Sequence, residues 1–520
     1  MKIFTLLTNN ERNLFYLVLL VTVLFLFYPP YLPMVDLPQH AAQVVMLDDL
    51  FKQQSKWSDL VQLNWDTPYL TGYFVWWLLY QFTDIVTSSK LLVVFIFLFN
   101  VWAVFLLRKS FQAESILEWA AITSFFGFAF QWGFVTFLLA IPIGILFFLS
   151  NKNWLETKKY RYFISIVLLG ILSYCSHVLI FSFFCFISYG YFLAIYFRQE
   201  SYKAGGGGGG GGGVIFTLPY LLFAIILIRY LGKTDLLQFK DYSENYVFLP
   251  FWYKVFTLIY YPWNMDYAVL YNVAWIVFFI LPSYMGYTLT KDIKRYIPFI
   301  GFLILWFSLP HALNQTAFIY ERFSIFMLPF YYLIFEKRSI KKNNGNIIFF
   351  NLMFFIFVFL SMGKVYYNNI QFNNDPNMRA YSKIIESMQS QKRILTLFSQ
   401  SSETSGLLTS STEYLHFGSW YQAQKHGWSD FNFAIYSPQI VRFKPNKMPN
   451  ISSRSGVVNK DWIISLDNCE DYDYLLMKTK ESPTMISTWL AENPRCKTFI
   501  LENQQQDWLL FKKIKENEAL

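Results

Sequence analysis

Long apolar runs dominate the first two-thirds of the chain and stop near residue 364. Most are close to the length of about 20 residues that crosses the hydrocarbon core of a membrane. They lie at 13–33, 89–107, 132–150, 161–177, 178–197, 214–231, 269–289, 296–312, 318–335 and 346–363. A shorter run at 118–131 pairs with 132–150 as a tight helical hairpin around Gln131-Trp132-Gly133. The pattern predicts a mainly α-helical polytopic membrane protein with about 11 transmembrane helices.

The run at 68–86 differs from these because it follows polar residues and contains Trp76, Trp77 and Tyr80. Aromatic side chains of this kind favour the membrane–water interface. We therefore expect 68–86 to form an interfacial helix that does not cross the membrane.

The distribution of Lys and Arg predicts the orientation of these helices. Basic residues gather in three short loops, at 151–161, 291–295 and 337–342, which the positive-inside rule places in the cytoplasm. The N-terminus is then cytoplasmic, and the segment 34–67 is the first external loop. Everything after residue 364 lies outside as well, and the number of crossings must be odd.

Beyond residue 364 the apolar runs become short and polar residues dominate. Strand-like runs lie at 393–398, 461–466 and 472–477, and a last strand is expected at 508–511. They alternate with helix-like runs at 376–391 and 482–492. This alternation predicts a small α/β domain. The expected organisation is a transmembrane domain, 1–363, followed by an extracytoplasmic domain, 364–520.

Composition supports the membrane assignment and bears on the cysteines. Hydrophobic residues make up 55% of the chain and charged residues 15%, against about 25% charged in soluble proteins. The net charge of +9 falls mostly in short loops, so it reports topology and not a nucleic-acid partner.

Cys469 and Cys496 both lie in the predicted external domain and could form a disulfide there, although spacing alone leaves this open. The glycine run Gly205–Gly213 is given no function.

The first external loop opens with Asp36-Leu37-Pro38-Gln39-His40. Asp36 is suited to cap a helix that has Pro38 in its first turn, and His40 would lie one helical turn further on. A carboxylate at the lipid–water boundary is costly to desolvate, so it usually has a partner or a function. Two readings stay open: a helix cap beside a polar histidine in a wet loop, or a catalytic pair.

This segment resembles the Asp-Leu-Pro-x-His that opens the first external loop in many bacterial members of the GT-C superfamily of membrane glycosyltransferases. The overall plan of the chain is similar too, with about eleven spans and an external C-terminal domain. The resemblance implies inverting transfer of a sugar from a polyprenyl-phosphate-linked donor to a glycan, lipid or protein acceptor. Asp36 would then be the general base and His40 a helper, in the cytoplasmic membrane of a bacterium. A divalent metal, Mg or Mn, bound by Asp36 with Asp48 or Asp49 is possible in such enzymes.

A departing lipid phosphate needs cations or hydrogen-bond donors near the external boundary. Arg322 suits this role because a guanidinium binds phosphate in a bidentate way, and Lys254, His177 and His311 fall on the same side. Each also has a structural reading, as a salt-bridge partner, an interface anchor, a cap or a packing residue.

Two other classes of function fit the same pattern. One is a transporter or flippase for a lipid-linked saccharide, and the other is a non-catalytic envelope assembly protein. A transporter typically shows internal repeats and ionisable groups at mid-membrane, whereas the ionisable residues here gather at the ends of the apolar runs. The sequence also lacks a Gly-rich phosphate loop and a Gly-x-Ser-x-Gly elbow, which argues against an ATPase or a nucleotide-sugar enzyme of cytosolic type.

Overall fold

A computed structural model describes most of the chain as two compact units. The described residues are 11–203, 212–234, 246–263, 278–313, 316–337, 345–398, 414–436, 438–448 and 458–514. The first unit comprises Met1–Leu26, Pro68–Gly72 and Val93–Val365, and the second comprises Phe27–Thr67, Tyr73–Leu92 and Tyr366–Leu520. Residues 205–211 of the glycine run and 269–277 of one expected span lie outside the described residues.

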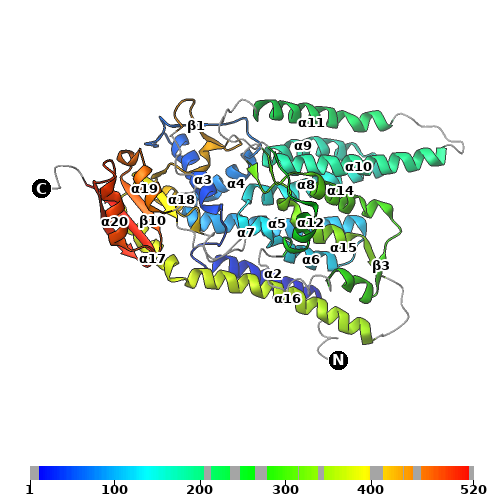
Figure 1. Cartoon of the computed structure of the whole chain (residues 1–520). Helices are drawn as coiled ribbons and strands as arrows, with labels where there is room; N and C mark the ends of the chain where they lie inside the picture. Colours follow the sequence, from blue (N-terminus) through cyan, green and yellow to red (C-terminus); the bar gives the residue numbers. More distant parts are fainter. Residues whose placement is uncertain are drawn as a thin grey trace. The chain divides into compact units, whose positions relative to one another are not determined.

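The first unit is built from helices (Figure 1). Its elements, some of which continue into the second unit, are α2 (Glu11–Phe27), α5 (Ile85–Phe111), α6 (Ile116–Phe125), α7 (Phe128–Trp132), α8 (Val135–Thr157), α9 (Tyr160–Ser176), α10 (Val178–Lys203), α11 (Gly212–Thr234), α12 (Phe251–Tyr260), α14 (Ile297–Ser308), α15 (Met327–Leu333) and α16 (Gly345–Asn374). Within the described residues, α5, α8, α10 and α16 are long and apolar enough to cross a membrane. The chain is therefore a helical protein of membrane-embedded type, and the number of eleven crossings stays a prediction.

Close helix packing in this unit depends on glycine. Helix α8 is almost entirely buried and packs against α9 and α10. A Cβ atom on Gly144 of α8 would lie 2.2 Å from the Phe184 ring of α10, and one on Gly170 of α9 would lie 2.2 Å from the Phe223 ring of α11. Small residues at such contacts allow helices to approach closely, as in membrane bundles.

Several expected spans take a different form. The segment 318–335 holds a short 3-10 helix η2 (Glu321–Phe326), then α15 and the start of strand β6 (Phe335–Lys337). Its helical part, 321–333, falls short of about 20 residues because β6 turns away to pair with β3 (Tyr287–Leu289). The expected hairpin has a left-handed turn at Gly133, with φ of 89°. The segment 68–86 contains α4 (Leu70–Tyr80), eleven residues long and too short for a straight crossing.

The C-terminal part of the second unit is an α/β domain, as the pattern predicted. Its sheet has the order β11-β12-β10-β7-β8, in which β10 and β8 run parallel to β7, and β12 runs antiparallel to β10 and β11. The strands are β7 (Arg393–Phe398), β8 (Trp428–Ser429), β10 (Tyr474–Lys478), β11 (Phe499–Gln505) and β12 (Trp508–Lys513). Helices α17 (Pro376–Ser387) and α20 (Pro483–Glu492) match the predicted helical runs.

The strand expected at 461–466 is wrong, since this segment forms helix α19 (Lys460–Ser465). The Asn459 side chain accepts a hydrogen bond from the backbone N–H of Trp462 and so caps the first turn of the helix. Ile463 is buried, whereas Trp462 and Ile464 are only partly covered. The apolar run therefore forms a short helix that packs on the core with Ile463 and, in part, with Trp462.

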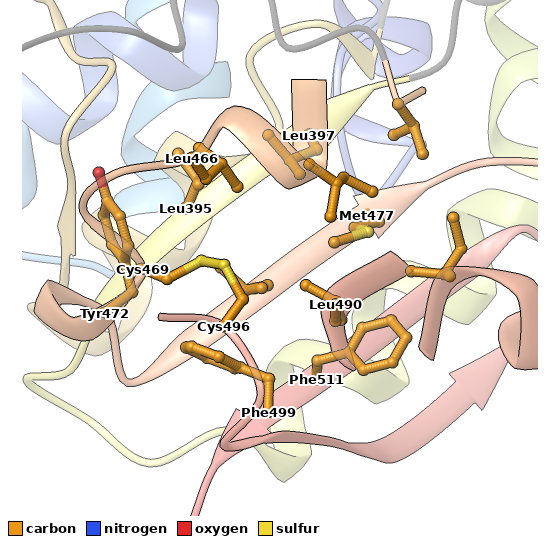
Figure 2. Close-up of a cluster of buried hydrophobic side chains, with 14 of the residues drawn as sticks. Leu395, Leu397, Leu466, Cys469, Tyr472, Met477, Leu490, Cys496, Phe499 and Phe511 are labelled. Atoms are coloured by element: carbon orange, nitrogen blue, oxygen red, sulfur yellow. A yellow bond between two sulfur atoms is a disulfide. The ribbon is translucent and has the colours of Figure 1, made fainter. Parts of the chain in front are cut away.

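A disulfide lies inside the core on one face of this sheet. Figure 2 shows the Cys469–Cys496 bond among buried side chains that include Leu466, Leu490 and Phe499. The Cα atoms of the two cysteines are 5.2 Å apart. The sequence left open whether these two cysteines pair, and in the structure they form a disulfide.

The first loop is built into the same unit as this domain. Helix α3 (Leu37–Phe51) is buried along almost its whole length and packs against α18 (Gly418–Lys425). Strand β1 (Val61–Leu63) pairs antiparallel with β9 (Val441–Phe443). The external loop of the sequence analysis is thus a structural part of the second unit, and side chains of α3 face the C-terminal domain.

Candidate functional site

The candidate site begins at the N-terminus of α3. Asp36 occupies the N-cap position, and Pro38 lies in the first turn as expected. The Asp36 side chain nevertheless makes no capping hydrogen bond. The role of helix cap, which was the simpler of the two readings, therefore does not account for this carboxylate.

The carboxylate of Asp36 faces a histidine of the C-terminal domain. Nε2 of His416 lies 3.3 Å from Oδ1 of Asp36, and the side chains are only 7% and 10% exposed. His416 sits just before α18, the helix that packs on α3. A buried carboxylate needs a hydrogen-bonding or charged partner, and His416 is the partner in this position.

Gln39 lies on the other side of the His416 ring and presents a donor to it. Its Oε1 accepts from the backbone N–H of Phe433 at 3.0 Å, so its Nε2 donates to the carbonyl of Phe431 at 3.0 Å. The same Nε2 lies 3.4 Å from Nδ1 of His416. A donor therefore faces Nδ1, an arrangement that favours the neutral tautomer with its proton on Nε2, next to Asp36.

His40 belongs to a neighbouring polar cluster. Its Nδ1 lies 2.7 Å from the hydroxyl of Tyr73, which in turn donates to Oε1 of Gln439. The ring of Phe433 packs edge-on against His40 and also contacts His416, with ring centroids 5.1 and 6.0 Å apart. Asp36 and His40 are therefore held in two adjoining networks that share an aromatic wall.

The other two acidic residues of α3 are engaged elsewhere. Asp48 accepts from Lys52, Trp77 and Gln81. Asp49 contacts Nδ1 of His426, with both oxygens at 3.0 Å, and this contact raises the pKa of His426 above its ordinary value. Across the described part of the chain, no three His, Cys, Asp or Glu side chains gather into a metal-binding group. Metal dependence stays a prediction, and Asp36 does not share a cluster with Asp48 or Asp49.

The four remaining candidates lie together in the first unit, around η2. The Arg322 guanidinium donates to the carbonyls of Phe318 and Ala317, and its carbon lies 3.8 Å from the centre of the Phe134 ring. His177 occupies the break between α9 and α10, where its ring packs on Tyr69 at 4.8 Å.

Lys254 and His311 have structural contacts as well. The ammonium of Lys254 donates to the carbonyls of Phe307 and Leu309 at the end of α14, a favourable place for a cation. His311 Nδ1 makes a short contact with the carboxylate of Glu321, which is buried. These arrangements agree with the structural readings of all four residues, and their role toward phosphate stays a prediction.

Sequence reasoning identified Asp36 and His40 but missed His416 and Gln39. No local pattern marks His416, since its partner Asp36 lies about 380 residues earlier in the chain. The spacing of Gln39 and Gln43 carried a signal, because residues four apart lie on one face of a helix. Both side chains bond to backbone groups of the C-terminal domain, Gln43 to the N–H and carbonyl of Val441.

The chain was also compared with known proteins. No protein-family model matches the sequence, and no curated protein matches it. The functional assignment of this chain accordingly rests on the residues and contacts of the two units.

Proposed function

We propose that the protein is an inverting glycosyltransferase of GT-C type that moves a sugar from a polyprenyl-phosphate-linked donor to an acceptor hydroxyl at the external membrane face. One observation carries the proposal. The Asp36 carboxylate makes no capping hydrogen bond, and it is held 3.3 Å from Nε2 of the buried His416.

The chemistry requires one base and one leaving group. The acceptor oxygen attacks the anomeric carbon and forms the new glycosidic bond, while the bond from that carbon to the lipid phosphate breaks. The acceptor proton passes to Asp36, and the phosphate leaves with the electron pair of the broken bond. His416 acts as a positioning residue that orients the carboxylate. The two side chains are 3.3 Å apart without substrate, and such contacts often shorten when the substrate binds.

The expected location is the cytoplasmic membrane of a bacterium, with the C-terminal domain outside. The four long apolar helices support a membrane location. The Cys469–Cys496 disulfide supports an oxidising compartment for the domain that contains it. The donor would be a polyprenyl-phosphate-linked sugar, and the acceptor a glycan, lipid or protein.

The test compares two Asp–His pairs on the same helix. In membrane vesicles that contain labelled lipid-linked sugar, Asp36→Asn should lower transfer about a hundredfold or more, because it removes the base and keeps the side-chain size. Asp49→Asn is the matched control, since Asp49 also contacts a histidine of the C-terminal domain. Its transfer should remain close to that of the wild type.

Other results would redirect the assignment. Unchanged transfer in Asp36→Asn, with the protein inserted and accumulated normally, rules out the base. Uptake or flipping of the lipid-linked saccharide without any transfer would favour the transporter alternative. Absence of both activities in the wild type would favour the non-catalytic assembly protein.

A further inference from the structure

A cavity of about 650 Å³ opens in the second unit, away from the residues of the Asp36 network. Its walls come from four parts of the chain: the segment after α2, the start of α5, helix α17 with the residues that follow it, and the end of α18. The polar lining side chains include Tyr31, Lys90, Ser382, Glu386, Gln424 and Lys425. No role proposed above uses this cavity.

The cavity lies at the edge of a membrane-spanning helix. Lys90 is near the start of α5, and the sequence from Leu91 to Leu107 is apolar with no charged residue. A lysine in this position marks the boundary between hydrocarbon and water. A ligand in contact with Lys90 would therefore be at the depth of lipid headgroups.

Both ammonium groups in the wall have donors available for a ligand. Nζ of Lys90 lies 3.4 Å from the carbonyl of Phe27, and Nζ of Lys425 lies 3.4 Å from the carbonyl of Glu386. Each contact uses at most one of the three N–H donors of an ammonium group. Neither lysine forms an ion pair with another described residue.

The cavity also contains one carboxylate, so its charge is mixed. Glu386 is exposed in the wall and likewise forms no ion pair within the described segments. The nearby Asp84 is not a second such group, because it accepts from the backbone N–H groups of Val86 and Thr87 and caps α5. The Tyr31 hydroxyl accepts from Gln424 at 2.8 Å, which holds the polar wall in place.

We propose that this cavity binds the headgroup of a zwitterionic phospholipid that carries a phosphate and a primary amine. Lys90 and Lys425 contact the phosphate oxygens, with the Ser382 hydroxyl as a further donor, and Glu386 contacts the amine. Two cations and one anion at headgroup depth fit this combination better than a purely anionic lipid. The inference does not depend on the proposed transferase activity.

The test measures lipid binding to the full-length protein in detergent by native mass spectrometry. Three probes are titrated: a short-chain phosphatidylethanolamine, a phosphatidylglycerol of equal chain length, and phosphoethanolamine without chains. Phosphatidylethanolamine should bind roughly tenfold more tightly than phosphatidylglycerol, as expected for one additional charged hydrogen bond. Equal binding of the two lipids overturns the proposal, and binding of phosphoethanolamine as tight as that of the lipid would indicate a soluble ligand instead.

The variants separate the two halves of the headgroup. Lys90→Gln with Lys425→Gln should weaken both lipids about tenfold or more, whereas Glu386→Gln should remove only the preference for the amine. Lys480→Gln with Lys497→Gln, and Glu481→Gln, are charge-matched controls on exposed residues elsewhere in the domain. Unchanged binding in both cavity variants overturns the proposal. Because Glu386 is exposed, its variant remains informative even if the double lysine variant folds poorly.

Discussion

Nε2 of His416 lies 3.3 Å from Oδ1 of Asp36, although about 380 residues separate the two in the sequence. The contact joins the first turn of α3 to the segment before α18, within one compact unit. An aspartate beside the first apolar run is therefore positioned by the C-terminal domain. The candidate site exists only when both parts of the second unit are folded together.

If Asp36 is the base, His416 should affect the chemical step more than substrate binding. We expect His416→Leu to lower kcat about 10- to 100-fold with little change in KM, since a hydrogen bond to a charged group contributes about 1.5–3 kcal/mol. His416→Gln retains an N–H donor at a similar reach and should recover most of the rate. The assay is steady-state transfer in reconstituted vesicles.

His426→Leu provides the control for the His416 variants, because it removes the histidine of the second Asp–His pair. Its kcat should stay near the wild-type value. Equal losses in His416→Gln and His416→Leu, or a rise in KM alone, would contradict a positioning role for His416.

Gln39 and Gln43 allow the stability of α3 docking to be separated from catalysis. Each glutamine bonds to one backbone N–H and one backbone carbonyl of the C-terminal domain. Replacing either with Leu should cost about 2–4 kcal/mol, because two buried backbone groups lose their partners. Thermal unfolding in detergent measures this loss.

Of the two variants, only Gln39→Leu should also lower the rate of transfer per folded molecule, because Gln39 contacts His416 and Gln43 does not. Similar specific activities in the two variants would show that the Gln39–His416 contact has no influence on the reaction.

The Asp49–His426 pair should make stability depend on pH. The hydrogen bond to Asp49 is the main cause that raises the pKa of His426; the charges of Asp49 and Asp48 also raise it, whereas burial and the charge of Lys52 oppose the shift. A raised pKa in the folded state means that the charged histidine stabilises the protein below about pH 6.5 and that this contribution is lost as the pH rises through the folded pKa.

The Tm of the wild type should therefore exceed that of Asp49→Asn by more at about pH 5.5 than at about pH 9. The corresponding difference in the free energy of unfolding should be small, below about 1 kcal/mol, because the His426 side chain is 41% exposed. A Tm difference that grows with pH would have the wrong sign for this pair.

The disulfide should stabilise the C-terminal domain substantially. Replacing Cys469 and Cys496 with Ser should lower its stability by about 2–4 kcal/mol, the usual effect for a bond that closes a loop of this kind. Limited proteolysis with and without reductant would detect the loss. Cys175→Ser is the control, since Cys175 is not disulfide-bonded, and this variant should remain as sensitive to reductant as the wild type.

The sequence by itself indicated apolar helices in the first two-thirds of the chain and an α/β arrangement near its C-terminus, although helix α16 runs on to Asn374, past the expected boundary at 363/364. Runs such as 89–107 carry this information locally, because the hydrophobicity of consecutive residues decides whether a helix suits lipid. Strands β7, β10 and β12 were predictable for the same reason, from their short apolar runs. The segment 461–466 was not, because its helix depends on a cap at Asn459 and on the packing of Ile463 and Trp462 against the core.

Only the tertiary structure decided the partners of the candidate residues. Asp36 contacts His416, His40 contacts Tyr73, and Arg322 donates to nearby carbonyls. Hydrophobic patterning reports whether a residue is buried, but a polar side chain takes its partner from whichever segment packs against it. That choice depends on the docking of α3 on α18 and on the turn at η2, and neither is encoded in the local pattern of residues.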